Sequence, residues 1–168
     1  PNADRATVRM LAASSAGLGD YIVTKPFVAE LEADPLRLWS ADDLLTRSLP
    51  PYQTPRFNQP GQDWAYSHTD FVMLGAVLEK ASGKKYGALL QELVLDPLAL
   101  RDTRFQLDTN PQLPVLHTLE EDRFQDSTYW NPSFVSWAAV TSNICDLSKW
   151  NRAFGTGSLL SPKMKGET

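Results

Sequence analysis

Cysteine and long apolar runs are both scarce in this sequence. Its 168 residues include one cysteine, Cys145, so no internal disulfide can form. The two histidines, His68 and His117, lie far from Cys145 along the chain, so neither a zinc site nor another cofactor is expected. We expect the thiol to be a small, buried hydrophobic group. Charged residues break the longest apolar runs within a few positions, so no membrane span is predicted.

An excess of charge of one sign is also missing. The net charge is −4, with acidic and basic residues interleaved. No basic face would neutralise phosphates, which argues against a nucleic-acid partner. Hydrophobic residues make up 42% of the chain, enough to pack one ordinary domain. The chain starts at Pro1, which is not a natural translational start, so a removed export signal is compatible with the sequence.

The sequence does contain many residues that interrupt secondary structure, since 12 prolines and 9 glycines divide it into short elements. Ser40, followed by Asp42 and Asp43, predicts an N-capped helix with acidic residues in its first turn. Apolar residues at helical spacing from Thr69 onward predict a helix that Gly83 ends.

Three further helices are expected. Residues 7–13 form a short apolar stretch with a C-cap region near Gly17. Residues 86–95 form a helix that stops before a proline, and residues 144–154 form another, with Ser142 as N-cap and Gly155 just past its end. Residues 101–117 are expected to be extended or looped, and few strands are convincing. The sequence therefore predicts a mostly helical chain with long loops.

Three blocks carry fixed spacings that go beyond secondary structure. The first contains Thr7-Val8-Arg9-Met10-Leu11, Ser14-Ser15-Ala16-Gly17-Leu18 and Asp20-Tyr21. The second contains Pro60-Gly61, Tyr66-Ser67-His68-Thr69-Asp70-Phe71, Leu74-Gly75, Glu79-Lys80, Ser82-Gly83-Lys84 and Pro97-Leu98. The third contains Ser136-Trp137, Thr141-Ser142, Asp146-Leu147 and Gly157-Ser158-Leu159-Leu160-Ser161.

Together these blocks resemble the class C β-lactamase, D,D-carboxypeptidase and esterase group of penicillin-recognising serine hydrolases. The resemblance implies that residues 1–168 are a single segment, the helical, loop-rich part of the family's α/β (α+β) fold, lacking most of its antiparallel sheet. In the family, a serine of S-x-x-K attacks a carbonyl, a tyrosine of Y-x-N relays the proton, and a K/H-x-G strand binds substrate. The chain matches only the middle motif and lies between the other two.

The resemblance assigns catalytic roles to Tyr66 and His68. Tyr66 takes the place of the tyrosine that passes a proton between serine and leaving group. His68 stands where the family has asparagine, and an imidazole offers one donor and one acceptor, so it could imitate part of the amide's role. A second interpretation stays open, in which His68 marks a weak or inactive site, because the ring is bulkier than an amide and can become charged.

Other positions carry weaker implications. Trp137 and Phe27 are predicted to line the substrate cleft, with core packing as the alternative for an aromatic residue. Ser67 is expected to orient the loop or cap the helix. Ser82-Gly83-Lys84-Lys85 satisfies S-x-x-K by letter, but a glycine at a helix end keeps its serine and lysine off one face. Gly155-Thr156-Gly157 lacks a preceding cation, and His117 has no partner at recognisable spacing.

Two functions follow as expectations. The first is part of a serine hydrolase acting by acyl-enzyme chemistry on D-alanyl peptides, β-lactams or small esters, outside the cytoplasm and without a cofactor. The second is a non-catalytic homologue that binds peptidoglycan or a protein partner. Because the family's helices pack on a sheet, a chain without that sheet should expose apolar surface, to be covered by the rest of the domain or by another chain.

Overall fold

The computed structural model describes residues 4–49, 55–57, 59–105, 118–120, 123–125 and 131–165. Within them the chain is mostly helical, as predicted, and two small antiparallel sheets pair β1 with β4 and β2 with β3. The helices are α1 (Val8–Ala12), η1 (Tyr21–Val23), α2 (Lys25–Ala33), α3 (Ala41–Arg47), α4 (His68–Ser82), α5 (Tyr86–Leu90), η2 (Gln91–Leu95), η3 (Pro132–Ala138), α6 (Ile144–Thr156) and α7 (Pro162–Lys165). The strands are β1 (Arg104–Phe105), β2 (Thr118–Glu120), β3 (Arg123–Gln125) and β4 (Val140–Thr141).

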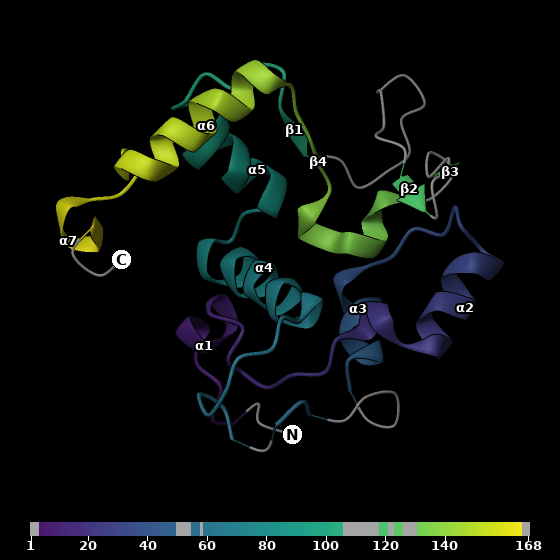
Figure 1. Ribbon diagram of the computed structural model, residues 1–168. Coiled ribbons are helices and arrows are strands. Elements are labelled where there is room, and N and C mark those ends of the chain that lie inside the picture. The colour runs from purple at the N-terminus through teal and green to yellow at the C-terminus, as the bar shows by residue number, and fades with distance from the viewer. Residues whose placement is uncertain are drawn as a thin grey trace.

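The helix α4 lies at the centre of the arrangement, with α1 on one side and α3 and η3 on another (Figure 1). It begins and ends close to where the sequence predicts, and Gly83 caps it with a left-handed φ of 69° that a side chain would strain. The N-terminus of α3 also matches the prediction. Ser40 and Asp43 form a reciprocal capping box, in which the backbone N–H of Asp43 donates to Ser40 Oγ at 3.1 Å.

Three predictions of helix ends and one prediction of burial are wrong. Asn143, not Ser142, caps α6, because its side chain accepts from the N–H of Asp146 at 2.8 Å. Gly155 lies inside α6, which continues to a left-handed Gly157. The helix α1 ends at Ala12, well before the C-cap region expected near Gly17.

Cys145 is exposed and not buried as predicted, since α6 contacts the rest of the chain through the side that carries Asp146 and Ala153. His117 lies outside the described residues.

The main core joins η1, α2 and α3 to α4. It is built from Tyr21, Phe27, Leu31, Trp39, Leu44 and Val72. The Tyr21 and Phe27 rings meet edge to face, with centroids 5.0 Å apart, and the hydroxyl of Tyr21 donates to the carbonyl of Phe134 at 2.8 Å. Burial, and next the charge of Asp20, raise the pKa of this hydroxyl far above its usual range, so it stays protonated.

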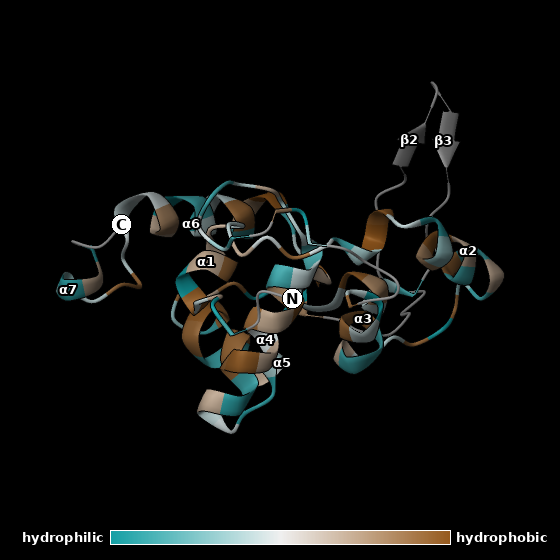
Figure 2. Cartoon of the chain, turned by 90° about the horizontal axis from the view of Figure 1, so that it is seen from below, coloured by the Kyte–Doolittle hydropathy of each residue, from teal (hydrophilic) through white to brown (hydrophobic). Residues whose placement is uncertain are grey.

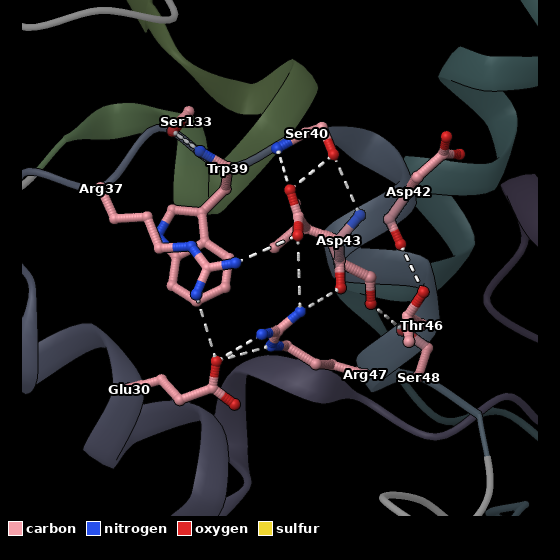
Figure 3. A network of polar contacts seen from close by, with 11 residues as sticks. Glu30, Arg37, Trp39, Ser40, Asp42, Asp43, Thr46, Arg47, Ser48 and Ser133 are labelled. Carbon is pink, nitrogen blue, oxygen red and sulfur yellow. Dashed lines mark hydrogen bonds and ion pairs between the residues drawn. The ribbon is translucent and has the colours of Figure 1, made fainter.

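A polar network covers the outer side of this core at Trp39 (Figure 3). The guanidinium groups of Arg37 and Arg47 lie 4.0 Å and 4.8 Å from the centre of the indole, and Glu30 pairs with both. The backbone N–H of Trp39 donates to the hydroxyl of buried Ser133 at 2.7 Å. This bond ties η3 to a segment 94 residues earlier in the chain.

The apolar stripe that predicts α4 is not the face this helix buries. The buried residues of α4 are Thr69, Asp70, Val72 and Gly75, whereas Phe71, Val77 and Leu78 are exposed. Figure 2, in which residues are coloured by hydropathy, shows hydrophobic residues along α4. The helix α6 likewise exposes Ile144, Leu147, Trp150 and Phe154, which recur at helical spacing along one side. Both helices therefore carry apolar faces that the described residues leave uncovered.

Candidate functional site

The loop that precedes α4 is joined by backbone hydrogen bonds to the loop that follows α1. The N–H of Ala65 donates to the carbonyl of Ser14 at 2.9 Å, and that of Gly61 donates to the carbonyl of Ser15 at 2.7 Å. These contacts connect the first and second sequence blocks. A site formed here is therefore built from two segments that lie about fifty residues apart, the spacing of Ala65 from Ser14.

Two buried hydroxyl groups also hold the loop before α4 in place. Ser67 Oγ donates to the carbonyl of Gly19 at 3.1 Å, and Thr69 Oγ1 donates to the same carbonyl at 2.6 Å. Ser67 occupies the N-cap position of α4 but makes no side-chain cap hydrogen bond. Of its two expected structural roles, Ser67 therefore orients the loop and does not cap the helix.

Tyr66 lies between these anchored residues and faces outward. The residue is 48% exposed, while its neighbour Ser67 is fully buried. The Tyr66 ring meets the His68 ring edge-on, with centroids 5.0 Å apart and planes at 88°, and lies 5.6 Å from the Phe71 ring. The structure thus brings Tyr66 and His68 together and keeps the phenol accessible.

A carboxylate from the first block holds the imidazole of His68. Nδ1 of His68 lies 3.2 Å from Oδ1 and 3.1 Å from Oδ2 of Asp20. The backbone N–H groups of His68 and Ile22 also donate to Oδ1, at 3.3 Å and 3.4 Å. The Asp20 side chain is 5% exposed and the His68 side chain 28%. The sequence shows Asp20 as part of a block but gives no sign of this pairing across 48 positions.

Asp70 is a second residue that the sequence does not single out. Its carboxyl group lies in the first turn of α4, is fully buried, and has no hydrogen-bond partner among the described residues. Burial, and next the charge of Asp20, raise the pKa of Asp70 to about 7. A buried acid without a donor is visible only once the helix is packed, because its sequence position resembles an ordinary first-turn aspartate.

The two aromatic residues predicted to line the substrate cleft differ in how far they are buried. Phe27 is 1% exposed and packs between Tyr21 and Trp39, so it contributes to the core and offers no surface to a ligand. Trp137 is half-buried, and its Nε1 donates to the carbonyl of Val72 at 2.9 Å. This bond holds Trp137 against α4, and a role for its exposed part in the substrate cleft stays a prediction.

Because Gly75 has no side chain, the Trp137 ring can pack closely against α4 at this position. A Cβ atom at position 75 would lie 2.0 Å from Trp137 Nε1, a distance at which something must move. Gly75→Ala should therefore destabilise the chain by about 1–3 kcal/mol through overpacking. Chemical denaturation of the two proteins measures the difference.

Gly155 provides the matched control, because it also lies inside a helix but a Cβ there meets nothing within 4 Å. Gly155→Ala should stabilise the chain by up to about 1 kcal/mol through helix propensity. Equal effects of the two substitutions would refute the packing role of Gly75.

The two sequence segments that imitate catalytic motifs are structural. Ser82 is the last residue of α4, and its Oγ donates to the carbonyl of Leu78 at 2.7 Å, while Lys84 lies beyond the left-handed Gly83 and pairs with Glu92. Thr156 Oγ1 donates back into α6, to the carbonyl of Arg152 at 3.0 Å. The first segment therefore does not present its serine and lysine on one helix face, and the second lies at the end of a helix and not in a strand.

The part of the chain that the structure describes shows no group of three or more His, Cys, Asp or Glu side chains that could hold a metal ion. No helix in these same residues has the length and apolar character needed to cross a membrane.

Comparison with known sequences identifies relatives along nearly the whole chain. Residues 1–167 match the profile of the family described as Beta-lactamase. Monacolin J acid methylbutanoyltransferase from Aspergillus terreus is 30% identical over 133 residues, which cover 74% of this chain and 31% of that protein. Penicillin-binding protein 4* from Bacillus subtilis is 29% identical over 100 residues, covering 58% of this chain and 21% of that protein.

Comparison of folds agrees with the profile. A D-stereospecific amidohydrolase from a Streptomyces species superposes with a TM-score of 0.79 and 28% identity, covering 94% of this chain and 48% of that one. The D-amino acid amidase of Ochrobactrum anthropi superposes with a TM-score of 0.74 over 97% of this chain and 46% of its own length. At 24% identity, the latter supports the fold alone. The chain therefore matches a helical portion of these structures, as predicted, and spans less than half the length of each.

Proposed function

The chain belongs to the β-lactamase family, and we propose that it is the helical, tyrosine-bearing part of a serine hydrolase that works through an acyl-enzyme. The relatives' lengths support a larger whole, since this chain covers 48% of the amidohydrolase and 31% of the acyltransferase. In this proposal, the nucleophilic serine and its lysine come from a part of the protein that these residues do not include.

The exposure of Tyr66 is the observation that carries the proposal. A proton relay must reach solvent or substrate, and Tyr66 is 48% exposed on a loop that several hydrogen bonds immobilise. A phenol ordinarily has a pKa of about 10, so the use of a phenol as a base at neutral pH requires a neighbouring cation. The lysine of an S-x-x-K motif would supply that cation.

The proposed mechanism gives Tyr66 two proton transfers. As the serine attacks the substrate carbonyl, the Tyr66 phenolate takes the proton of the serine hydroxyl. The phenol then gives this proton to the leaving amine or alkoxide as the carbonyl re-forms and the acyl-enzyme is left. Donors outside this chain would stabilise the oxyanion. The proposed substrates are D-alanyl peptides, β-lactams or small esters, and the similarity to a D-stereospecific amidohydrolase supports D-configured amides.

The uncovered apolar faces are independent support for the proposal that this chain is one part of a larger domain. The exposed side chains of α4 and α6 are positioned as they would be if further secondary structure packed on both helices. We propose that the rest of the same domain packs on these two faces, and a second protein chain is the alternative.

A location outside the cytoplasm is also part of the proposal, supported by the similarity to a penicillin-binding protein.

The test compares the isolated chain with the full-length protein that carries it. We expect the 168-residue chain alone neither to hydrolyse nitrocefin nor to form a covalent penicillin adduct, and the full-length protein to do at least one of them. Both are followed by absorbance and by intact mass. Serine-dependent turnover by the isolated chain would refute the proposal.

His68 in place of asparagine favours one alternative, a homologue that binds peptidoglycan without turning it over. The sequence that flanks this chain in the full-length protein discriminates between the two functions. An upstream S-x-x-K and a downstream K/H-x-G support the hydrolase, while loss of either, together with peptidoglycan binding and no adduct, supports the binding module.

A further inference from the structure

The proposed mechanism leaves the pair formed by Asp20 and His68 without a role. The Asp20 carboxylate is anchored, because Oδ1 accepts hydrogen bonds from the backbone N–H groups of Ile22 and His68 and the side chain is 5% exposed. An acceptor fixed in this way cannot follow a moving ring. The carboxylate therefore determines where the imidazole lies.

The pairing also determines which ring nitrogen carries the proton. Nδ1 of His68 lies within 3.2 Å of both Asp20 oxygens, and an ionised carboxylate can only accept. A neutral imidazole has one N–H, so this hydrogen bond places the proton on Nδ1 and leaves the lone pair on Nε2. Among the described residues, Nε2 has no hydrogen-bond partner.

We infer that Asp20 is a positioning residue that holds His68 as the Nδ1–H tautomer, so that Nε2 presents a fixed hydrogen-bond acceptor beside Tyr66. The two rings lie 5.0 Å apart at 88°, and the His68 side chain is 28% exposed, so the ring borders the same accessible region as the phenol. The catalytic use of this acceptor rests on the proposed function, whereas the tautomer does not.

The inference narrows the class of substrate. An asparagine at position 68 would offer both an N–H donor and a carbonyl acceptor, while the neutral His68 tautomer offers an acceptor alone. An acceptor pairs with a group that carries a proton, such as the N–H of an amide or peptide. An ester of the same acyl group has no such proton. The site should therefore favour D-configured amides over the corresponding esters.

The tautomer can be measured directly by nuclear magnetic resonance on the full-length protein labelled with ¹⁵N-histidine. The signals that are lost in His68→Gln are assigned to His68. In alkaline buffer, where an imidazole is neutral, we expect a protonated Nδ1 and an unprotonated Nε2 for His68. Free imidazole side chains favour the opposite tautomer, so the result is distinctive.

Two variants give the matched comparison. Asp20→Asn keeps a side chain of the same shape but removes the charge, and should shift His68 toward the Nε2–H form. Asp43→Asn, which removes a helix-capping carboxylate at a distance from His68, should leave its spectrum unchanged. A wild-type spectrum with Nε2 protonated would overturn the inference, and that spectrum alone decides if Asp20→Asn does not fold.

The full-length protein supplies the catalytic readout. Asp20→Asn should lower the ratio of kcat/KM for a D-amino acid amide to that for the matching ester by about fivefold, the equivalent of one hydrogen bond. An unchanged ratio would contradict the role in substrate choice. An inactive wild-type protein whose His68 is the Nδ1–H tautomer would instead count against the proposed function while the positioning by Asp20 stands.

Discussion

Replacing Tyr66 with phenylalanine should lower the kcat/KM of the full-length hydrolase by about 10²- to 10⁴-fold, the usual contribution of a positioned general acid–base. The substitution removes one oxygen atom. The ring keeps its contacts with His68 and Phe71, and the hydroxyl has no hydrogen-bond partner among the described residues. Stability should therefore change little, so lost activity would reflect proton transfer and not unfolding.

Two measurements separate these effects. Nitrocefin or D-amino acid amide hydrolysis gives the activity, and denaturation gives the free energy of unfolding. Trp64→Phe is the control, since Trp64 is an exposed aromatic residue on the same loop and should retain full activity. A Tyr66→Phe enzyme as active as wild type would remove the phenol from the mechanism.

Asp70→Asn should stabilise the chain by about 2–4 kcal/mol above pH 8. The folded protein raises the pKa of Asp70 from 3.8 to about 7, so the folded state holds a proton that the unfolded state has already released. Stability therefore falls as the pH rises from about 4 to about 7, and the full cost remains above that range. Asparagine is neutral at every pH and does not carry this cost.

The pH dependence is the decisive part of this prediction. Below pH 4, both the acid and the amide are neutral, so the two proteins should be about equally stable, and the difference should grow toward pH 8. Urea denaturation across this range measures it. Asp42→Asn, an exposed first-turn acid of α3, should instead destabilise slightly through the helix dipole. A difference for Asp70→Asn that does not vary with pH would disprove the titration of a buried carboxyl.

Local signals explain most of what could be predicted. The capping box at Ser40 and the stop at Gly83 each depend on side chains within a few residues, so the sequence defines α3 and α4 closely. The one-residue error at the start of α6 has the same origin, because Ser142 and Asn143 are both good N-caps and packing selects between them.

The features that could not be predicted are long-range or depend on shape. Asp20 and His68 pair across 48 positions, and nothing in their local sequence indicates it. The burial of Asp70 depends on which face of α4 packs inward, and the apolar periodicity of this helix points to the opposite face. Aromatic residues occur both in cores and in binding sites, so the sequence does not distinguish the two uses, and only the packing shows that Phe27 belongs to the core.

The most direct test of the central claim is a mass-spectrometric time course of penicillin labelling in the full-length protein. We predict that the acylated serine lies outside these 168 residues, and that Tyr66→Phe slows its labelling. Labelling of a serine within the chain, such as Ser82, or labelling at an undiminished rate in Tyr66→Phe, would contradict the account.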